Sequence, residues 1–421
     1  MISNLRNCFF GTDTPISTLC GFTNRVYLNN AATPLVAKPA IQELYKTLPI
    51  YSYGNEPNDL STQLTSKYNE VRDIVMNFIG ANSSLDTVIY TSNTTSAINI
   101  LSQVYYEKDP NQVVLTTRME HMANYLPFRE RMKTLLVDLT PDGNVDMNDY
   151  TAKLEQYSGQ IKLVTVTGAS NITGIIPPFH DMAAIAHSHG TKIFVDAVQL
   201  VQHKNFTMKP HDDNSHIDFV SFDGHKFYTG QSGGVLVGDR GFLDQYKPLI
   251  YGAGITDFVS NSKIIYKGSP ERYEAGYPDF LGIISLGAAI RFINEIGIKN
   301  VEEWERGLYQ YLIRRLSQIP NLILYGDVYN NIRVPFVAFN LKNMSYQRLA
   351  NKLGYGYGID IASGTNGANL YVQDLLGLTD KQAFSLYRSG EGYGIVRASI
   401  GLFNNYDDID RLVDALFCIS S

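Results

Sequence analysis

The chain has 421 residues, of which 44% are apolar and 18% charged, with 28 Tyr and 20 Phe. At about 150 residues per domain, this length predicts two or three compact units. The composition excludes collagen-like, disordered and disulfide-scaffold classes. With 41 acidic and 35 basic residues, the formal net charge is −6. This charge offers no footprint for a phosphate backbone, so we expect no nucleic-acid partner.

The cysteine usage and the apolar stretches indicate a cytoplasmic protein. Cys8, Cys20 and Cys418 are odd in number and lack metal-type spacing, so we expect neither a disulfide framework nor a metal site. The first residues lack a basic flank followed by an apolar stretch, and no secretory signal is apparent. Residues 280–293 are the most apolar stretch, but they are fewer than the ~20 that span a membrane and include Arg291.

Between residues 86 and 237, short β-rich runs alternate with helical patterns. This alternation is typical of βαβ units that build a mainly parallel sheet under helices. Residues 178–188 have helical spacing, and Pro177 and Pro178 suit a first helical turn. The predicted strands are residues 87–90, 112–116, 162–167, 192–195, 219–222 and 234–237.

A long helical pattern over residues 281–316, interrupted near Gly297, is predicted to connect two domains. After Pro320 the pattern indicates a smaller α+β unit, in which residues 354–358 form turns. We expect an N-terminal segment (1–25), a large domain (26–295) and a smaller C-terminal domain (296–421). The C-terminal elements are predicted strands at 322–325, 334–341 and 394–400 and helices at 345–353 and 407–417.

Two charged side chains follow neighbouring strands of the predicted sheet. Lys226 comes after the strand at 219–222, and Asp196 comes after the strand at 192–195. Open α/β sheets bind ligands beyond the carboxyl ends of their strands, and Asn171 follows a third strand there. Taken alone, Lys226 could extend from the strand end to water and Asp196 could cap a helix.

A hydroxyl-rich turn at residues 92–96 follows the first strand and starts a helix. The free N–H groups and the dipole of a helix N-terminus suit a phosphate, and Thr94 and Thr95 add hydroxyl donors. His121 could stack on a ring. Together with a Schiff-base lysine and a carboxylate for a pyridine nitrogen, this set matches the needs of pyridoxal phosphate.

These motifs, in this order, resemble the class V aminotransferase family, and specifically its cysteine desulfurase and selenocysteine lyase branch. The resemblance covers nearly the whole chain, from Val26 to the terminal helix. It implies a pyridoxal-phosphate-dependent transferase fold of type I, with a mainly parallel seven-stranded-type sheet in the large domain and a smaller α+β domain. It also implies a homodimer. The motifs that carry it are residues 93–95, 119–121, 170–171, 196–203 and 224–226.

The resemblance assigns a role to each matching residue. Lys226 is the Schiff-base lysine and the acid and base, Asp196 pairs with the pyridine nitrogen, and His121 stacks on the ring. The other roles implied are hydrogen bonds near the cofactor's phenolic oxygen or the substrate carboxylate (Asn171, Gln199), phosphate binding (Thr94, Thr95, Ser221, His225) and capture of the substrate carboxylate (Arg397). In isolation, Arg397 could equally be a structural ion-pair partner.

One departure from the family concerns its sulfur-accepting cysteine. Desulfurases carry that cysteine on a mobile loop, and the matching stretch here, residues 361–369, places Gly367 or a near neighbour at its position. None of the three cysteines lies there, and Ala362 stands where an arginine is frequent. Because glycine cannot accept sulfur, we expect no persulfide formation by the usual route.

Other departures lie on the substrate side. Residues 52–59 lack a frequent histidine and arginine, Tyr277 replaces a threonine that binds phosphate from the partner subunit, and Asp223 replaces a frequent serine. A carboxylate that pointed inward at position 223 would repel phosphate. We therefore expect Asp223 to face away or to meet a cation.

The chain is thus predicted to be a pyridoxal phosphate enzyme that acts on an α-amino acid. Once the α-proton is removed, the fate of the carbanion sets the reaction. Loss of a β-substituent by a cysteine-independent C–S lyase is our first expectation. Transamination, epimerisation and a non-catalytic binding role are the alternatives.

Overall fold

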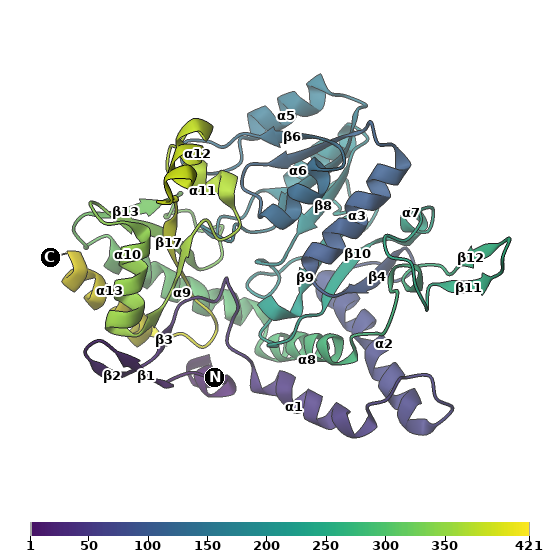
Figure 1. Ribbon diagram of the computed structural model, residues 1–421, viewed down its shortest axis with the longest axis horizontal. Coiled ribbons are helices and arrows are strands. Elements are labelled where there is room, and N and C mark those ends of the chain that lie inside the picture. Colours follow the sequence, from purple (N-terminus) through teal and green to yellow (C-terminus); the bar gives the residue numbers. More distant parts are fainter. Residues whose placement is uncertain (1, 421) are drawn as a thin grey trace.

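The computed structural model describes residues 2–420, and its largest sheet has seven strands in the order β4-β10-β9-β8-β7-β5-β6 (Figure 1). Six of these strands run in one direction, and β10 runs in the opposite direction between β4 and β9. The predicted mainly parallel α/β sheet is confirmed. The strands are β4 (Asp86–Thr91), β5 (Val113–Thr117), β6 (Lys133–Val137), β7 (Ile161–Thr167), β8 (Lys192–Asp196), β9 (Phe219–Asp223) and β10 (Gly234–Asp239).

Every strand predicted from residues 86–237 is present, with ends shifted by two residues at most. The prediction missed β6, which lies at the edge of the sheet beside β5. Within β6 only Val137 is fully buried, and the strand opens on the exposed Lys133. Its apolar run, residues 135–137, is short and mostly half-buried, unlike the almost wholly buried central strands.

Helices cover both faces of this sheet. On one face, Val114 of β5 and Phe194 of β8 belong to the same buried cluster as Leu101, which lies on α3 (Thr94–Lys108). On the other face, the alternate strand residues pack in a larger cluster with the remaining helices. Those helices are α2 (Asp59–Ile79), α6 (Phe179–Ser188) and α8 (Phe280–Ile296), with α1 (Lys38–Thr47) and α5 (Met147–Gln156) further out.

The predicted long helix is two helices, α8 and α9 (Ile298–Leu316), which meet at Gly297. Gly297 has φ +85°, a value that a residue with a Cβ rarely adopts, so the predicted interruption is confirmed. Within the described residues no single helix is long and apolar enough to cross a membrane. The α8–α9 pair passes that test of length and composition only as two halves bent by 77°.

A four-stranded antiparallel sheet, in the order β13-β14-β17-β16, organises the C-terminal part. Its cluster of buried residues includes Leu308 of α9 and also Val26 and Leu28 near the N-terminus. The domain boundaries at residues 25 and 295 stay predictions. The elements are β13 (Leu322–Tyr325), β14 (Phe336–Leu341), β16 (Ala362–Gly364), β17 (Ile395–Ser399), α10 (Tyr346–Asn351), α11 (Asn369–Leu375), α12 (Asp380–Ser389) and α13 (Tyr406–Ser420).

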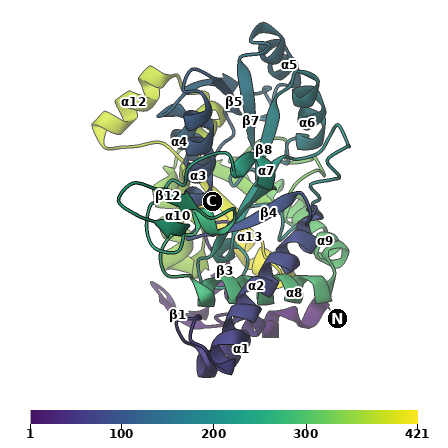
Figure 2. The same cartoon turned by 90° about the vertical axis from the view of Figure 1, so that its right-hand side faces the viewer.

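Several short strands and helices lie outside the two main sheets. The hairpin of β11 (Thr256–Val259) and β12 (Ile264–Tyr266) projects from the right of Figure 1, and α12 stands out in the turned view of Figure 2. The predicted turn at 354–358 begins as a wide helical turn, Lys352–Gly356. The remaining short elements are β1 (Pro15–Thr18), β2 (Gly21–Asn24), β3 (Val26–Tyr27), β15 (Ile359–Asp360), α4 (Leu126–Arg129) and α7 (Arg240–Leu243).

Candidate active site

A cavity of about 360 Å³ opens at the carboxyl ends of β7, β8 and β9. Every site residue predicted from the sequence lines it, with the exception of Ser221. The lining comes from both parts of the molecule, because Arg397 belongs to β17 and Asn366 to the loop before α11. The convergent residues are Thr94, Thr95, His121, Asn171, Asp196, Gln199, His225, Lys226 and Arg397.

Lys226 lies on the short turn Gly224–Lys226 that follows β9. Its Nζ donates to the carbonyl oxygen of Ala31 at 2.9 Å and to that of Ala32. Burial, together with the nearby charge of Arg397, lowers the pKa of Lys226 to about 8. A lysine held in this way is partly neutral near pH 8 and can act as a nucleophile or a base.

Asp196 ends β8 and is buried. Its Oδ1 accepts a hydrogen bond from the N–H of Val198 at 3.2 Å, so it also stabilises the following turn. Burial raises the pKa of Asp196 to about 7, and the charge of Asp223 adds to this effect. A cationic N–H at this position, such as a pyridinium, would keep the carboxylate ionised.

His121 follows β5 and lies under the loop that contains Gly367. Its Nδ1 accepts from the N–H of Ala123 at 3.1 Å, and the N–H of Met122 donates to the carbonyl of Gly367 at 2.7 Å. Burial lowers the pKa of His121 to about 4, with added repulsion from Lys226 and Arg397. The ring is therefore neutral near pH 7, as stacking on an aromatic cofactor requires.

Glu120 supports His121, and the sequence analysis missed it. Its carboxylate is fully buried and accepts from the Oγ1 of Thr117 at 2.6 Å, the Nδ2 of Asn124 at 2.7 Å and the N–H of Thr167 at 3.0 Å. These bonds tie the end of β5 to the end of β7. A glutamate beside a histidine has no distinctive sequence pattern, so only the tertiary contacts reveal this role.

Arg397 is a buried guanidinium without a carboxylate partner among residues 2–420. It donates to the carbonyl of Asn171 at 2.7 Å and to the Oδ1 of Asn29 at 3.2 Å, and its Nε has no hydrogen-bond partner. Burial lowers the pKa of Arg397 to about 10. The structure thus gives no support to the structural ion pair that was one reading of Arg397.

Asn171 and Gln199 reach the cavity from two further loops. The Nδ2 of Asn171 donates to the carbonyl of Asn366 at 2.8 Å, and the Nε2 of Gln199 donates to the carbonyl of Ala31 at 2.8 Å. The Oε1 of Gln199 is buried without a partner. An unpaired buried amide oxygen indicates room for a donor from a bound molecule.

The N-terminus of α3 forms the far end of the cavity. The buried Thr94 hydroxyl has no partner in the described structure, and Thr95 and His225 lie beside it. Asp223, which we expected to face away or to meet a cation, lies in the cavity wall. Its Oδ1 is 2.8 Å from the Nδ1 of His225, and its Oδ2 accepts from the N–H of Thr94 at 3.2 Å.

Ser221 does not reach the cavity. It lies within β9, opposite Asp196 in the strand pairing, and its side chain is fully buried. The structure therefore contradicts the expectation that Ser221 contributes to phosphate binding. Asp223 lies on the same face of β9, two residues further on at the end of the strand, and it lines the cavity instead.

The cavity fits pyridoxal phosphate on its own chemistry. It holds a reactive amine, a buried carboxylate, a neutral imidazole, and polar atoms of Thr94 and Gln199 that lack partners. Such orphaned groups cost free energy unless a ligand satisfies them. One feature strains the fit at the phosphate end, namely the carboxylate of Asp223.

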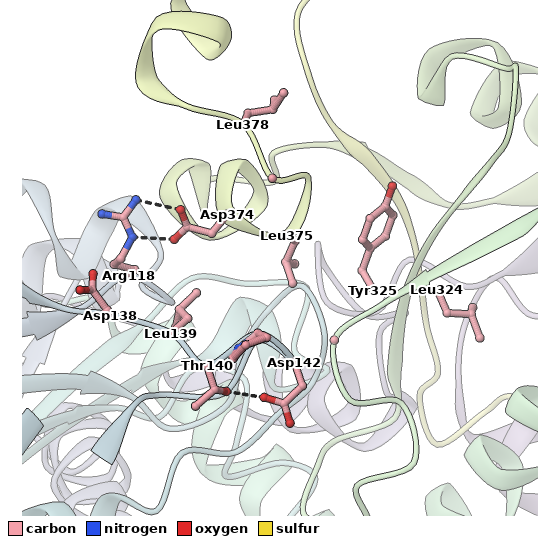
Figure 3. Close-up of a pocket in the computed structure, with 14 residues that line it drawn as sticks. Arg118, Asp138, Leu139, Thr140, Asp142, Leu324, Tyr325, Asp374, Leu375 and Leu378 are labelled. Atoms are coloured by element: carbon pink, nitrogen blue, oxygen red, sulfur yellow. Dashed lines mark hydrogen bonds and ion pairs between the residues drawn. The ribbon is translucent and has the colours of Figure 1, made fainter. Parts of the chain in front are cut away.

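A second cavity, of about 750 Å³, is larger but lacks every predicted site residue (Figure 3). Arg118, just beyond β5, forms two hydrogen bonds with Asp374 of α11, at 2.6 and 2.8 Å. This pair joins the segment before His121 to the helix after Gly367. We interpret this cavity as the gap between the large domain and the C-terminal part of the chain, and the Arg118–Asp374 ion pair as a contact that connects them.

Of the departures on the substrate side, Asp223 lies in the wall of the main cavity, whereas Tyr277 lies outside it beside residues 51–52. The hydroxyl of Tyr277 donates to the Oη of Tyr51 at 2.9 Å and to the carbonyl of Ser52 at 3.1 Å. Tyr277 is half exposed and lines a neighbouring pocket that also contains Thr95. Among residues 2–420, no cluster of three or more His, Cys, Asp or Glu side chains could hold a metal ion.

Comparison with known proteins identifies the family. The class V aminotransferase model matches residues 26–412, so the chain belongs to this family. A probable cysteine desulfurase of Halalkalibacterium halodurans is 31% identical over 401 residues, which cover 93% of this chain and 92% of that protein. A cysteine desulfurase of Serratia proteamaculans is 30% identical, with the same coverage of each chain.

Solved structures agree with this assignment. The apo cysteine desulfurase of Thermococcus onnurineus aligns with a TM-score of 0.83 and 27% identity, over 94% of each chain. An S-sulfonic acid form of an Escherichia coli cysteine desulfurase, 24% identical, has the same fold at a TM-score of 0.83. The chain is a pyridoxal-phosphate-dependent enzyme of fold type I, as the sequence predicted.

Proposed function

We propose that this enzyme is a cysteine-independent C–S lyase, which eliminates a sulfur substituent from the β-carbon of an α-amino acid. The observation that carries the proposal is the environment of Gly367. A Cβ atom there would lie 2.2 Å from the Nε2 of His121, and the backbone has φ +76°. A cysteine at this position would need His121 to move and would sit in a strained backbone conformation.

The cysteines of the chain support the same conclusion. Cys20 and Cys418 are exposed, Cys8 is partly buried near the N-terminus, and none lines the cavity. A sulfur atom released from the substrate would meet no thiol of this chain at the cavity wall. Release of the sulfur species to solvent is then the simpler outcome.

Several residues would hold the cofactor, which supplies an electron sink for the substrate's α-carbon. Asp196 would keep a cationic ring nitrogen paired, and His121 would cover a ring face. Gln199 would satisfy its free Oε1, and Thr94 and Thr95 would donate hydroxyls at the N-terminus of α3. These roles stay predictions, and their support is the shared cavity.

Arg397 and Lys226 would act on the substrate. The unpaired guanidinium of Arg397 suits an α-carboxylate, because no internal carboxylate in residues 2–420 competes for it. The Nζ of Lys226, with its lowered pKa of about 8, would accept the α-proton. In the overall reaction the β-sulfur group leaves with the bonding electron pair, and hydrolysis of the remaining enamine yields pyruvate and ammonia.

A product assay tests the proposal. The holoenzyme is incubated with cysteine or cystine, and pyruvate, ammonia, alanine and persulfide are quantified. Pyruvate and ammonia in equal amounts support the lyase, and replacing Cys8, Cys20 and Cys418 by serine should leave the rate unchanged. Alanine with enzyme-bound sulfur would overturn it, and a new amino acid formed only with a keto acid would indicate a transaminase.

We also propose that the chain forms a homodimer through the β11–β12 hairpin. Phe258, Val259, Ile264 and Ile265 are each 41% to 62% exposed on a hairpin that projects from the body (Figure 1). Exposed apolar patches commonly mark protein interfaces.

Light scattering tests this interface. The wild type should be a dimer, and the double variant Val259→Lys with Ile264→Lys should be a monomer. The control Leu19→Lys, at an 84% exposed site, should stay a dimer. A wild-type monomer would refute the interface.

A further inference from the structure

Asp223 occupies the anion-binding end of the cofactor cavity. It is 3% exposed, and it lies against two groups predicted to bind the phosphate, Thr94 and His225. The N–H of Thr94, at the N-terminus of α3, donates to its Oδ2 at 3.2 Å, and the Nδ1 of His225 is 2.8 Å from its Oδ1. The carboxylate of Asp223 is therefore an anion that already occupies the place where the cofactor phosphate would bind.

The positive groups around Asp223 already stabilise its own negative charge. Its own turn contributes His225 and Lys226, β8 contributes the carboxylate of Asp196, and α3 contributes its N-terminal dipole. Burial opposes the ionisation of Asp223, but His225, the N–H of Thr94 and Lys226 together outweigh it and lower the pKa of Asp223. The carboxylate is thus charged when the phosphate arrives.

We propose that Asp223 makes binding of the cofactor phosphate proton-linked, so that the phosphate enters beside Asp223 only with uptake of one proton from solvent. The proton lies between a carboxylate oxygen and a phosphate oxygen and converts a repulsive contact into a hydrogen bond. Two anions that share a site raise the pKa of one of them. The inference rests on the cofactor and is independent of the reaction that the enzyme catalyses.

A consequence is weak discrimination between phosphorylated and unphosphorylated cofactor forms at high pH. The second phosphate pKa is about 6, so above that pH the free cofactor is a dianion and the proton has to be supplied on binding. The affinity should then fall by about tenfold per pH unit, the slope for one proton. Below pH ~6 the slope should flatten, because the free phosphate already carries the proton.

The experiment measures binding to the full-length apoprotein by calorimetry. The probes are pyridoxamine phosphate and pyridoxamine, which lack an aldehyde and so form no Schiff base with Lys226. Titrations at pH 6 to 9, in buffers of different ionisation enthalpy, count the protons taken up. The proteins are wild type, Asp223→Asn, Asp223→Ser and the control Asp212→Asn, which removes one exposed carboxylate elsewhere.

We expect the wild type and Asp212→Asn to take up close to one proton more with pyridoxamine phosphate than with pyridoxamine, since the titration of Asp196 and Lys226 affects both probes alike. Both Asp223 variants should bind the phosphorylated probe at least about tenfold more tightly at pH 8, with a flattened pH slope and an unchanged affinity for pyridoxamine. The unchanged pyridoxamine affinity also reports a folded site. Equal proton uptake by the wild type with the two probes, or variants that gain nothing for the phosphate, would overturn the inference. Because no readout uses catalysis, failure of the lyase proposal leaves this result intact.

Discussion

Gly367 lies against His121 so closely that a Cβ atom added to Gly367 would be 2.2 Å from the imidazole Nε2. The N–H of Met122 also donates to the carbonyl of Gly367 at 2.7 Å. The segment that is a mobile, cysteine-bearing loop in desulfurases is here fastened over the histidine. It therefore forms a roof of the cavity.

This contact predicts the effect of Gly367→Ala. A left-handed backbone alone costs an alanine about 1 kcal/mol, and the collision with His121 should add about 1–3 kcal/mol of overpacking. Chemical denaturation would measure the loss. Gly390→Ala is the matched control, since Gly390 has φ +80° with nothing within 4 Å of its Cβ position. If the two variants lost the same free energy of unfolding, the loop at Gly367 would accommodate a Cβ atom without a collision with His121.

The Arg118–Asp374 pair should hold this roof in place. Its side chains are about a quarter exposed, and such a pair contributes on the order of 0.5–1 kcal/mol. Asp374→Asn should therefore speed hydrogen exchange in residues 365–376 by roughly two- to fivefold. Glu70→Gln, which breaks the exposed pair with Arg291, should leave these residues unchanged. Unaltered exchange in Asp374→Asn would show that the pair does not restrain the roof.

Arg397→Lys should weaken substrate binding while the charge is kept. A lysine cannot present two parallel N–H donors, and hydrogen bonds to charged groups contribute about 1.5–3 kcal/mol. We expect KM for the amino acid to rise roughly tenfold to a hundredfold. The affinity for pyridoxal phosphate should stay within error, which separates a lost carboxylate contact from a damaged site. An unchanged KM would assign Arg397 to structure alone.

Lys226 should react as an amine of low basicity. Its pKa in the folded apoprotein is about 8, so its neutral fraction rises as the pH increases through 8. Reductive methylation, followed residue by residue with mass spectrometry, should level off for Lys226 just above this pH. In denaturant the same lysine should return to the ordinary midpoint near 10.4. A midpoint near 10 in the folded protein would contradict the effect of burial.

Much of the fold follows from local patterns. Central strands such as β7 and β8 are almost wholly buried and rich in apolar and β-branched residues, so their prediction is confirmed within two residues. The edge strand β6 is mostly half-buried. Residues Val26–Tyr27 pair with Ile359–Asp360, a contact across most of the chain that no local pattern specifies.

The candidate site shows the same division. Lys226, Asp196 and His121 follow buried strands, so the sheet brings them together as expected. Ser221 and Asp223 share one face of β9, but Asp223 ends the strand and lines the cavity, whereas Ser221 is buried two residues earlier, a difference that no local pattern marks. Glu120 was missed because the bond that ties it to the sheet comes from Thr167, 47 residues away.

The hydrogen bonds of Arg397 join residues 29, 171 and 397. Contacts of such long sequence separation form late in folding, because the loops between them must close first. The corner around Arg397, which we propose binds the substrate carboxylate, is therefore assembled only after nearly the entire polypeptide has left the ribosome. A nascent or C-terminally truncated chain could fold its seven-stranded sheet and yet have no grip on an amino acid.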